Sequence, residues 1–224
     1  MTAATDAAER LIRGRHATRA FLPDPVPGDT IEAIFALAGA SPSASNAQPW
    51  RIEVVSGAKR DDLAAALIAA HREGRQTTDF PYSEDVYEPV HQRRRRAWGA
   101  SLYAALDIDR GAGDLRAAYD ERSLSLYGAP HVAMLYAPES GDPRLTADLG
   151  MYTQTLLLAM TAHGVGSCPQ AMLSFYADTV RETLGVAGGR LLLGVSFGYA
   201  DPAAPINAVA VGREPLTETT RFHH

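Results

Sequence analysis

The chain has 224 residues, a formal net charge of −5 at pH 7 and a single cysteine. Its 46% hydrophobic and 21% charged residues are typical of a globular domain with a core of its own, which excludes a disordered chain. The acidic balance argues against a general nucleic-acid binder, because such proteins carry a basic excess. One cysteine excludes an intramolecular disulfide and fits the reducing cytoplasm, where we expect the protein.

Membrane insertion and metal binding are both disfavoured by the residue pattern. No run of 18 or more apolar residues occurs, so we expect no transmembrane helix. The first 15 residues lack the apolar stretch of a secretory signal. The seven histidines show no His-x-x-x-His spacing, so we expect no metal site. Cys168 has no obvious basic activator beside it, and we expect it to pack rather than to attack.

Apolar periodicity and chain breakers predict an alternation of helices and strands. Helices are expected at residues 5–14, 29–40, 58–73, 90–106, 112–124, 146–163 and 175–184. Strands are expected at residues 50–55, 131–136, 191–197 and 209–211. The run 191–197 is nearly continuously apolar, as in a strand buried on both faces. These elements predict one α+β domain over residues 1–224, with an excursion at about 75–125 and a tail from about 202.

Helix ends and faces follow from particular residues. Asp29 or Thr30 would cap the second helix, and Gly164 and Gly166 would end the sixth. The second helix has an apolar face, formed by Ile31, Ile34, Phe35 and Ala38.

Two parts of the excursion stand out. Residues 75–89 lack periodicity and carry aromatic side chains among acidic ones, which is compatible with a flap over a site. Arg93 to Arg96 could form a phosphate patch, but four successive helical positions point around the whole helix. A solvated or interface helix is therefore the favoured interpretation of the arginine run.

Arg15 and Arg19 are four positions apart, so they face the same side in a helix and in a strand alike. Two planar guanidinium forks that converge in this way suit a phosphate group. The alternative is a solvated basic surface, which the spacing alone favours.

The loop at residues 41–50 combines small residues with two amide side chains. Small residues let the backbone approach a flat ligand, and Asn46 and Gln48 could pair with the edge of a flavin ring. A turn-rich connector whose polar side chains satisfy their own backbone explains the same residues.

Taken together, five segments resemble the nitroreductase family of flavin mononucleotide (FMN)-dependent oxidoreductases. They are RHATRAF at 15–21, SPSASNAQPW at 41–50, GVGSCPQ at 164–170, LGVSFGY at 193–199 and VGREPL at 211–216. The resemblance extends from residue 15 to about residue 221 in the expected order, and the 41–50 loop is its most specific part. Segments 168–170 and 198–202 look most like the nitrobenzoate-reductase branch.

The resemblance implies a three-layer α/β/α sandwich with a mostly antiparallel central sheet. It implies a homodimer with FMN at the subunit interface, and a C-terminal tail that packs on the partner subunit. It assigns no catalytic role to a side chain, because flavin N5 carries the chemistry.

The resemblance also assigns residues to the cofactor. Arg15, His16 and Arg19 would hold the ribityl phosphate or the nearby flavin edge, and Arg213 would add a third positive group at the phosphate. Ala17 stands where the family often has a serine, so one hydroxyl bond worth about 0.5–1.5 kcal/mol would be missing. The partner's flavin would be reached by Pro42, Ser43, Ala44 and Asn46, with Gln48 as a further cofactor contact. The flavin ring would be lined near its reactive nitrogen by Pro169, Gln170 and Ala171.

The implied activity is hydride transfer from NADH or NADPH through FMN to small electron acceptors such as nitroaromatics or quinones. No Gly-x-Gly-x-x-Gly or Walker sequence is present, so nicotinamide would share the pocket over the flavin with the acceptor. Two substrates that bind in turn predict ping-pong kinetics.

Other functions remain open on the same fold, which hosts reductive dehalogenases and a flavin-fragmenting enzyme. A dehalogenase lid should combine Glu, Tyr and Lys, and residues 75–89 contain no lysine. A non-catalytic FMN-binding module would hold flavin that nicotinamide does not reduce. A phosphate-dependent interaction domain would hold no flavin.

Overall fold

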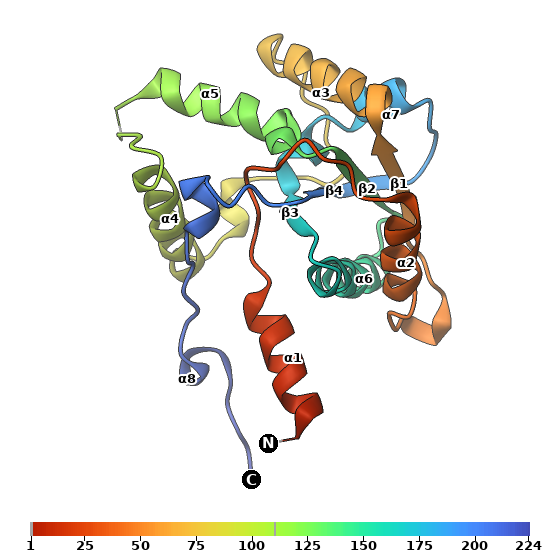
Figure 1. Cartoon of the computed structure of the whole chain (residues 1–224), viewed down its shortest axis with the longest axis vertical. Coiled ribbons are helices and arrows are strands. Elements are labelled where there is room, and N and C mark those ends of the chain that lie inside the picture. Colours follow the sequence, from red (N-terminus) through yellow and green to blue (C-terminus); the bar gives the residue numbers. More distant parts are fainter. Residues whose placement is uncertain (1, 110) are drawn as a thin grey trace.

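A four-stranded antiparallel sheet lies at the centre of the computed structural model, which describes residues 2–109 and 111–224 (Figure 1). In the order β1-β2-β4-β3, its strands are β1 (Arg51–Ser56), β2 (His131–Ala137), β4 (Arg190–Gly198) and β3 (Gly166–Gln170). All three neighbouring pairs are antiparallel, which confirms the predicted sheet. The sequence does not predict β3, because its residues GSCPQ are poor strand formers.

The inner strands β2 and β4 carry the core on both of their faces. Every residue of β2 is buried, and successive side chains belong to opposite hydrophobic clusters. In β4, Leu191 packs on one side of the sheet, whereas Val195 and Phe197 pack on the other. This confirms the prediction that the apolar run 191–197 is buried on both faces.

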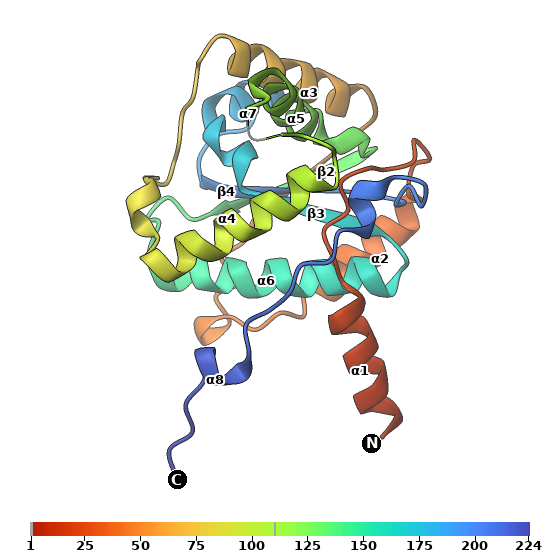
Figure 2. The same ribbon diagram turned by 90° about the vertical axis from the view of Figure 1, so that its left-hand side faces the viewer.

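Helices cover both faces of the sheet, which confirms the three-layer α/β/α arrangement (Figures 1 and 2). One layer consists of α2 (Gly28–Ala38) and α6 (Pro143–Ala162). The other consists of α3 (Gly57–Arg72) and α7 (Ala177–Leu184), with α5 (Gly113–Leu124) beside α3.

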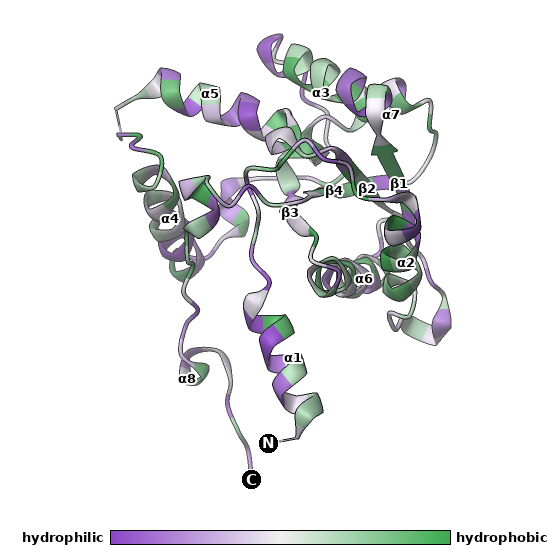
Figure 3. Ribbon diagram, in the orientation of Figure 1, coloured by the Kyte–Doolittle hydropathy of each residue, from purple (hydrophilic) through white to green (hydrophobic). Residues whose placement is uncertain are grey.

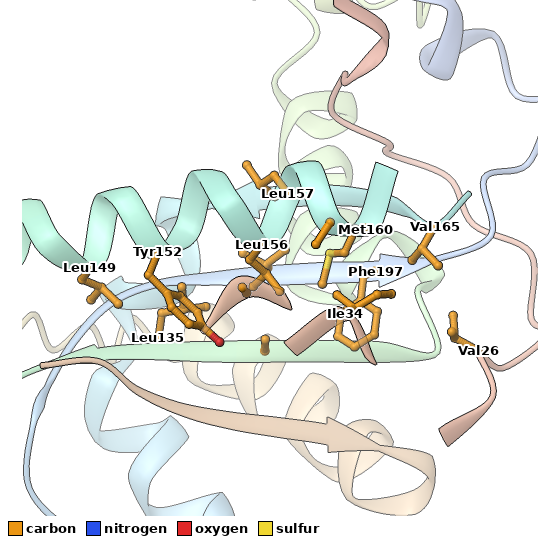
Figure 4. Close-up of a cluster of buried hydrophobic side chains, with 14 of the residues drawn as sticks. Val26, Ile34, Leu135, Leu149, Tyr152, Leu156, Leu157, Met160, Val165 and Phe197 are labelled. Carbon is orange, nitrogen blue, oxygen red and sulfur yellow. The ribbon is translucent and has the colours of Figure 1, made fainter. Parts of the chain in front are cut away.

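Side chains of α2 and α6 form the larger part of one core cluster (Figure 4). Leu149, Leu156 and Met160 of α6 face the sheet, where they meet Leu135 and Phe197. In α2, Ile34 and Ala38 are buried while Ile31 and Phe35 pack against the same cluster, so the predicted apolar face is confirmed.

The remaining helices lie outside these layers. They are α1 (Ala3–Gly14), α4 (Pro89–Ala104) and the short α8 (Leu216–Thr219). Short 3-10 helices are η1 (Ala44–Asn46), η2 (Glu84–Val86), η3 (Leu126–Gly128), η4 (Ala171–Phe175) and η5 (Pro205–Ala208). Both termini stand away from the body, and the tail after β4 passes between α4 and α1 (Figure 2). Among the described residues, no helix has the length and apolar character needed to cross a membrane.

The structure contradicts three details predicted from the sequence: the cap of the second helix, the strand at 209–211 and the role of Gly166. The second helix begins at Gly28 after Pro27 without a side-chain cap, because Asp29 instead accepts hydrogen bonds from Thr30. The strand expected at 209–211 forms no ladder within the described chain, because no other strand of the sheet lies beside it. Gly164, at φ +71°, does follow the sixth helix, but Gly166 begins β3.

Candidate functional site: a cleft lined by arginines

The basic segment at residues 15–19 is extended and lies along the free edge of β3. Ala17 forms a parallel bridge to Ser167, and the Thr18 N–H donates to the Ser167 carbonyl at 2.9 Å. Alternate side chains of an extended segment point to opposite sides. Thr18 is therefore buried, whereas Arg15, Ala17 and Arg19 face a cleft on the other side.

We call this cleft the arginine cleft, and its volume is about 790 Å³. One wall is the segment that ends α1 and runs on to Arg19, and the opposite wall is the tail at residues 207–213. Trp98 of α4 and Pro169 of β3 complete the lining. Of the residues predicted to bind a cofactor, it brings together Arg15, His16, Ala17, Arg19, Pro169 and Arg213.

Three guanidinium groups at the cleft have no carboxylate partner among the described residues. Arg15, Arg19 and Arg213 form no ion pair there, and no Asp or Glu lines the cleft. Arg19 lies over the Trp98 ring at 5.5 Å, and Arg213 donates to carbonyls of its own segment at 3.0 Å. Converging unpaired cations create a strongly positive field, so the cleft suits a phosphate group.

Trp98 and Asn207 are among the cleft residues that are absent from the sequence-based site. Trp98 follows the arginine run of α4, and its neighbours give no sign that it reaches the cleft formed by the distant residues 15–19. Asn207 accepts a hydrogen bond from the main-chain N–H of Arg19 at 2.7 Å. A single asparagine in a proline-rich tail carries no local signal of such a long-range contact.

The three predicted ring-lining residues differ in how they could meet a ligand. Pro169 faces the cleft, and Ala171 is exposed where η4 begins. Gln170 is buried, and its side chain donates to the Ser123 carbonyl at 2.7 Å and accepts from the Ser196 hydroxyl. The amide side chain of Gln170 is thus occupied within the core, and only its main chain is left to line a ligand.

Cys168 lies beneath the cleft and is only 2% exposed. It packs with Phe21, Tyr127 and Ala129, and burial raises the pKa of its thiol to about 11. The thiolate is therefore scarce at neutral pH. The burial of the side chain confirms that Cys168 packs in the core.

The loop at residues 41–50 lies beside α6, and none of its residues lines the arginine cleft. The buried Asp148 of α6 accepts the Ala44 N–H at 3.1 Å, and Ser43 Oγ accepts the Gln48 N–H at 2.9 Å. Ser45, Asn46 and Gln48 adopt positive φ values of 51°, 56° and 48°.

Positive φ is unfavourable for these residue types, and such strain concentrates at functional sites. Most side chains of the loop, those of Pro42, Ala44, Asn46 and Gln48 included, are exposed. Within one chain, the loop and the three arginines therefore form two separate surfaces.

The fold and the cleft together define an α/β/α domain with an arginine-lined cleft at the edge of its sheet. The model of the nitroreductase family matches residues 12–199. The chain is 60% identical to the nitroreductase NfnB of Mycolicibacterium smegmatis, over 96% of this chain and 92% of that protein. It is 32% identical to a 4-nitrobenzoate reductase of Nocardioides sp., over 98% of this chain and 91% of the relative.

The solved structures agree with these relatives. The crystal structure of the FMN-dependent nitroreductase NfnB from Mycobacterium smegmatis in complex with NADPH superposes with a TM-score of 0.97. The two chains are 58% identical, and the match covers 99% of this chain and 100% of that one. The chain belongs to the nitroreductase family. The family resemblance expected from the five sequence segments is thereby confirmed.

Proposed function

We propose that the protein is an FMN-dependent oxidoreductase that uses NADPH or NADH to reduce nitroaromatics, quinones or similar electrophiles. The observation that carries the proposal is the arginine cleft, where three unpaired guanidiniums face a space without any carboxylate. FMN ends in a phosphate, which is the ligand chemistry that such a cleft favours. The name of the M. smegmatis structure, FMN-dependent and in complex with NADPH, supports the same choice.

The cleft fits FMN in size as well as in charge. Its volume of about 790 Å³ lies within the range of about 300–1,000 Å³ for small-molecule sites. Arg15, His16, Arg19 and Arg213 would hold the phosphate, and Pro169 would lie along the ring with the main chain of the next two residues. Bound FMN would supply the redox chemistry, accepting hydride from a nicotinamide and passing it to the acceptor.

The chain's own residues would bind and orient, and none would act as a nucleophile. Cys168 is buried below the cleft, and no Asp or Glu of the described chain lines the cleft. Trp98 and Val211 line the cleft with apolar side chains that would pack against a bound ring. Nicotinamide and acceptor would occupy the same face of this one site, so they would bind in turn.

Steady-state kinetics test this function. Double-reciprocal plots against NADPH at several concentrations of a nitroaromatic such as 4-nitrobenzoate should be parallel. Parallel lines are expected when the oxidised nicotinamide leaves the site before the acceptor binds. Each substrate should inhibit competitively at high concentration. Intersecting lines would show that both substrates bind together, and the single-site mechanism would have to be abandoned.

The same proposal includes a homodimer. Helix α1 has no buried residue, and apolar side chains on both projecting termini are exposed, among them Ile12 (58%), Leu216 (61%) and Phe222 (68%) (Figures 1 and 3). A partner subunit would cover these groups, and its 41–50 loop would reach the flavin that the arginines hold. Obligate interfaces often exceed about 2,000 Å².

Sedimentation of the FMN-loaded protein at micromolar concentration should give a dimer. A single species of monomer mass would contradict this part of the proposal. The cytoplasm remains the compartment that we propose, because the single cysteine needs no oxidising environment.

A further inference from the structure

Asn207 is located in η5, where the tail leaves the body of the domain. Its side-chain amide forms three hydrogen bonds, all to main-chain groups. Oδ1 accepts the N–H of Arg19 at 2.7 Å, and Nδ2 donates to the carbonyls of Ala20 at 2.8 Å and Asp201 at 2.9 Å. Both hydrogens of the amide are thereby used, so Asn207 has none left to donate to a ligand.

On one side, Asn207 fixes the main chain of the basic segment. The Thr18 N–H is bonded to Ser167, and the Leu22 N–H is bonded to Tyr199 at 2.9 Å. The Arg19 N–H lies between these two points, and Asn207 is its acceptor. Without the Asn207 side chain, the partly buried N–H of Arg19 would have no hydrogen-bond acceptor, and the main chain that carries the Arg19 guanidinium would be held less firmly.

On the other side, Asn207 is the last firm anchor of the tail before Arg213. Within the described chain, residues 209–213, which follow η5, form one hydrogen bond between main-chain groups, a long one of 3.5 Å from the Val209 N–H to the Ile206 carbonyl. The next long-range polar contact is the ion pair of Glu214 with Arg94 of α4, which is partly exposed. The wall of the cleft that carries Arg213 is therefore held at Asn207 on one side and at Glu214 on the other.

We propose that Asn207 is a positioning residue that sets the spacing between Arg19 and Arg213, and thereby the affinity of the cleft for a phosphate-bearing flavin. This inference rests on the proposed function. Asn207 acts through the two arginine-bearing segments, since its own amide hydrogens are already used by main-chain carbonyls.

The test compares FMN with riboflavin, which has the same ring but carries no phosphate. Their dissociation constants are measured by fluorescence titration on the apoprotein of the parent and of Asn207→Ala. We expect the preference for FMN over riboflavin to fall by about tenfold, while riboflavin affinity stays within about twofold of the parent. Arg51→Ala is the control, because it removes two side-chain bonds to main-chain carbonyls outside the cleft and should keep the parent preference.

A general loosening of the fold would weaken both flavins equally, and that result would overturn the proposal, as would an unchanged preference in Asn207→Ala. If Asn207→Ala does not fold, Asn207→Ser is measured with the same expectation, because it also removes the two donated bonds. A parent protein that binds neither flavin would instead overturn the proposed function itself.

Discussion

Two groups of arginines in this protein have opposite surroundings. On α4, Arg94 pairs with Glu214 at 3.0 Å, and Arg95 pairs with Glu84 and lies over the Tyr87 ring at 4.0 Å. In the arginine cleft, Arg15, Arg19 and Arg213 have no acidic partner among the described residues. Consecutive arginines on α4 are distributed around the helix, whereas the cleft arginines come from two distant segments, residues 15–19 and the tail, and line one cleft.

The cleft arginines therefore differ from Arg94 and Arg95, which already have carboxylate partners in the free protein. An exposed ion pair of this kind contributes little to stability. Because the cleft arginines carry like charges without a carboxylate partner among the described residues, we expect them to favour the binding of an anion such as the proposed FMN phosphate.

The largest expected effect is that of Arg19→Ala, because its guanidinium belongs to the unpaired group. Charge-assisted hydrogen bonds are worth about 1.5–3 kcal/mol each, so FMN affinity should fall about tenfold or more. Fluorescence titration measures the FMN affinity. The control is Arg10→Ala, because Arg10 is an exposed residue of α1 that lies outside the cleft. Equal affinity in parent and Arg19→Ala would remove Arg19 from the phosphate site.

A smaller effect is expected for Arg213→Ala, because Arg213 lies on the exposed tail. We expect FMN affinity to fall by about threefold to tenfold, near the lower limit for a charge-assisted bond. Activity should fall when the variant is assayed at low FMN and should largely return with excess FMN. Activity that excess FMN does not restore would mean that Arg213 contributes to more than retention of the cofactor.

The smallest effect on flavin binding is expected on α4. Arg95→Gln should change FMN affinity by less than about twofold, because Arg95 is already paired outside the arginine cleft. A tenfold loss of FMN affinity in Arg95→Gln would erase the distinction between the two groups.

The same pair gives a pH-dependent signature. The hydrogen bond from Arg95 lowers the pKa of Glu84 to about 2, so the pairing is fully present above the ordinary value of 4.5 and is lost as pH falls towards 2. Carboxyl NMR titration should show the Glu84 pKa moving back towards 4.5 in Arg95→Gln. An unchanged pKa in the variant would mean that Arg95 does not hold the Glu84 carboxylate.

Much of the fold could be predicted from the sequence, because periodicity reports burial on strands and helices. The double-sided run of β4 and the apolar face of α2 were predictable for this reason. β3 could not be predicted, since five small or polar residues become a strand only through pairing with β4. The strand expected at 209–211 does not form for the opposite reason: its residues favour strands, but no strand of the described chain lies beside them to pair with.

The candidate site was predictable where the residues themselves carry the chemistry. The family resemblance assigned Arg15, Arg19 and Arg213 to the phosphate, whereas the spacing of Arg15 and Arg19 alone favoured a solvated surface. The structure places all three in one cleft. The inward orientation of Gln170 could not be anticipated, because it depends on Ser123 and Ser196 from distant elements. Asn207 was missed for the same reason, since its partners lie 188 and 187 positions away.

The visible absorption spectrum of the purified, folded protein tests whether the arginine cleft holds FMN for nicotinamide-driven reduction. The spectrum should show the bands of bound oxidised flavin, and anaerobic addition of NADPH should bleach them. A flavin that stays oxidised after NADPH is added would indicate a non-catalytic FMN-binding module rather than an enzyme. A colourless folded protein that does not take up added FMN would contradict the account as a whole.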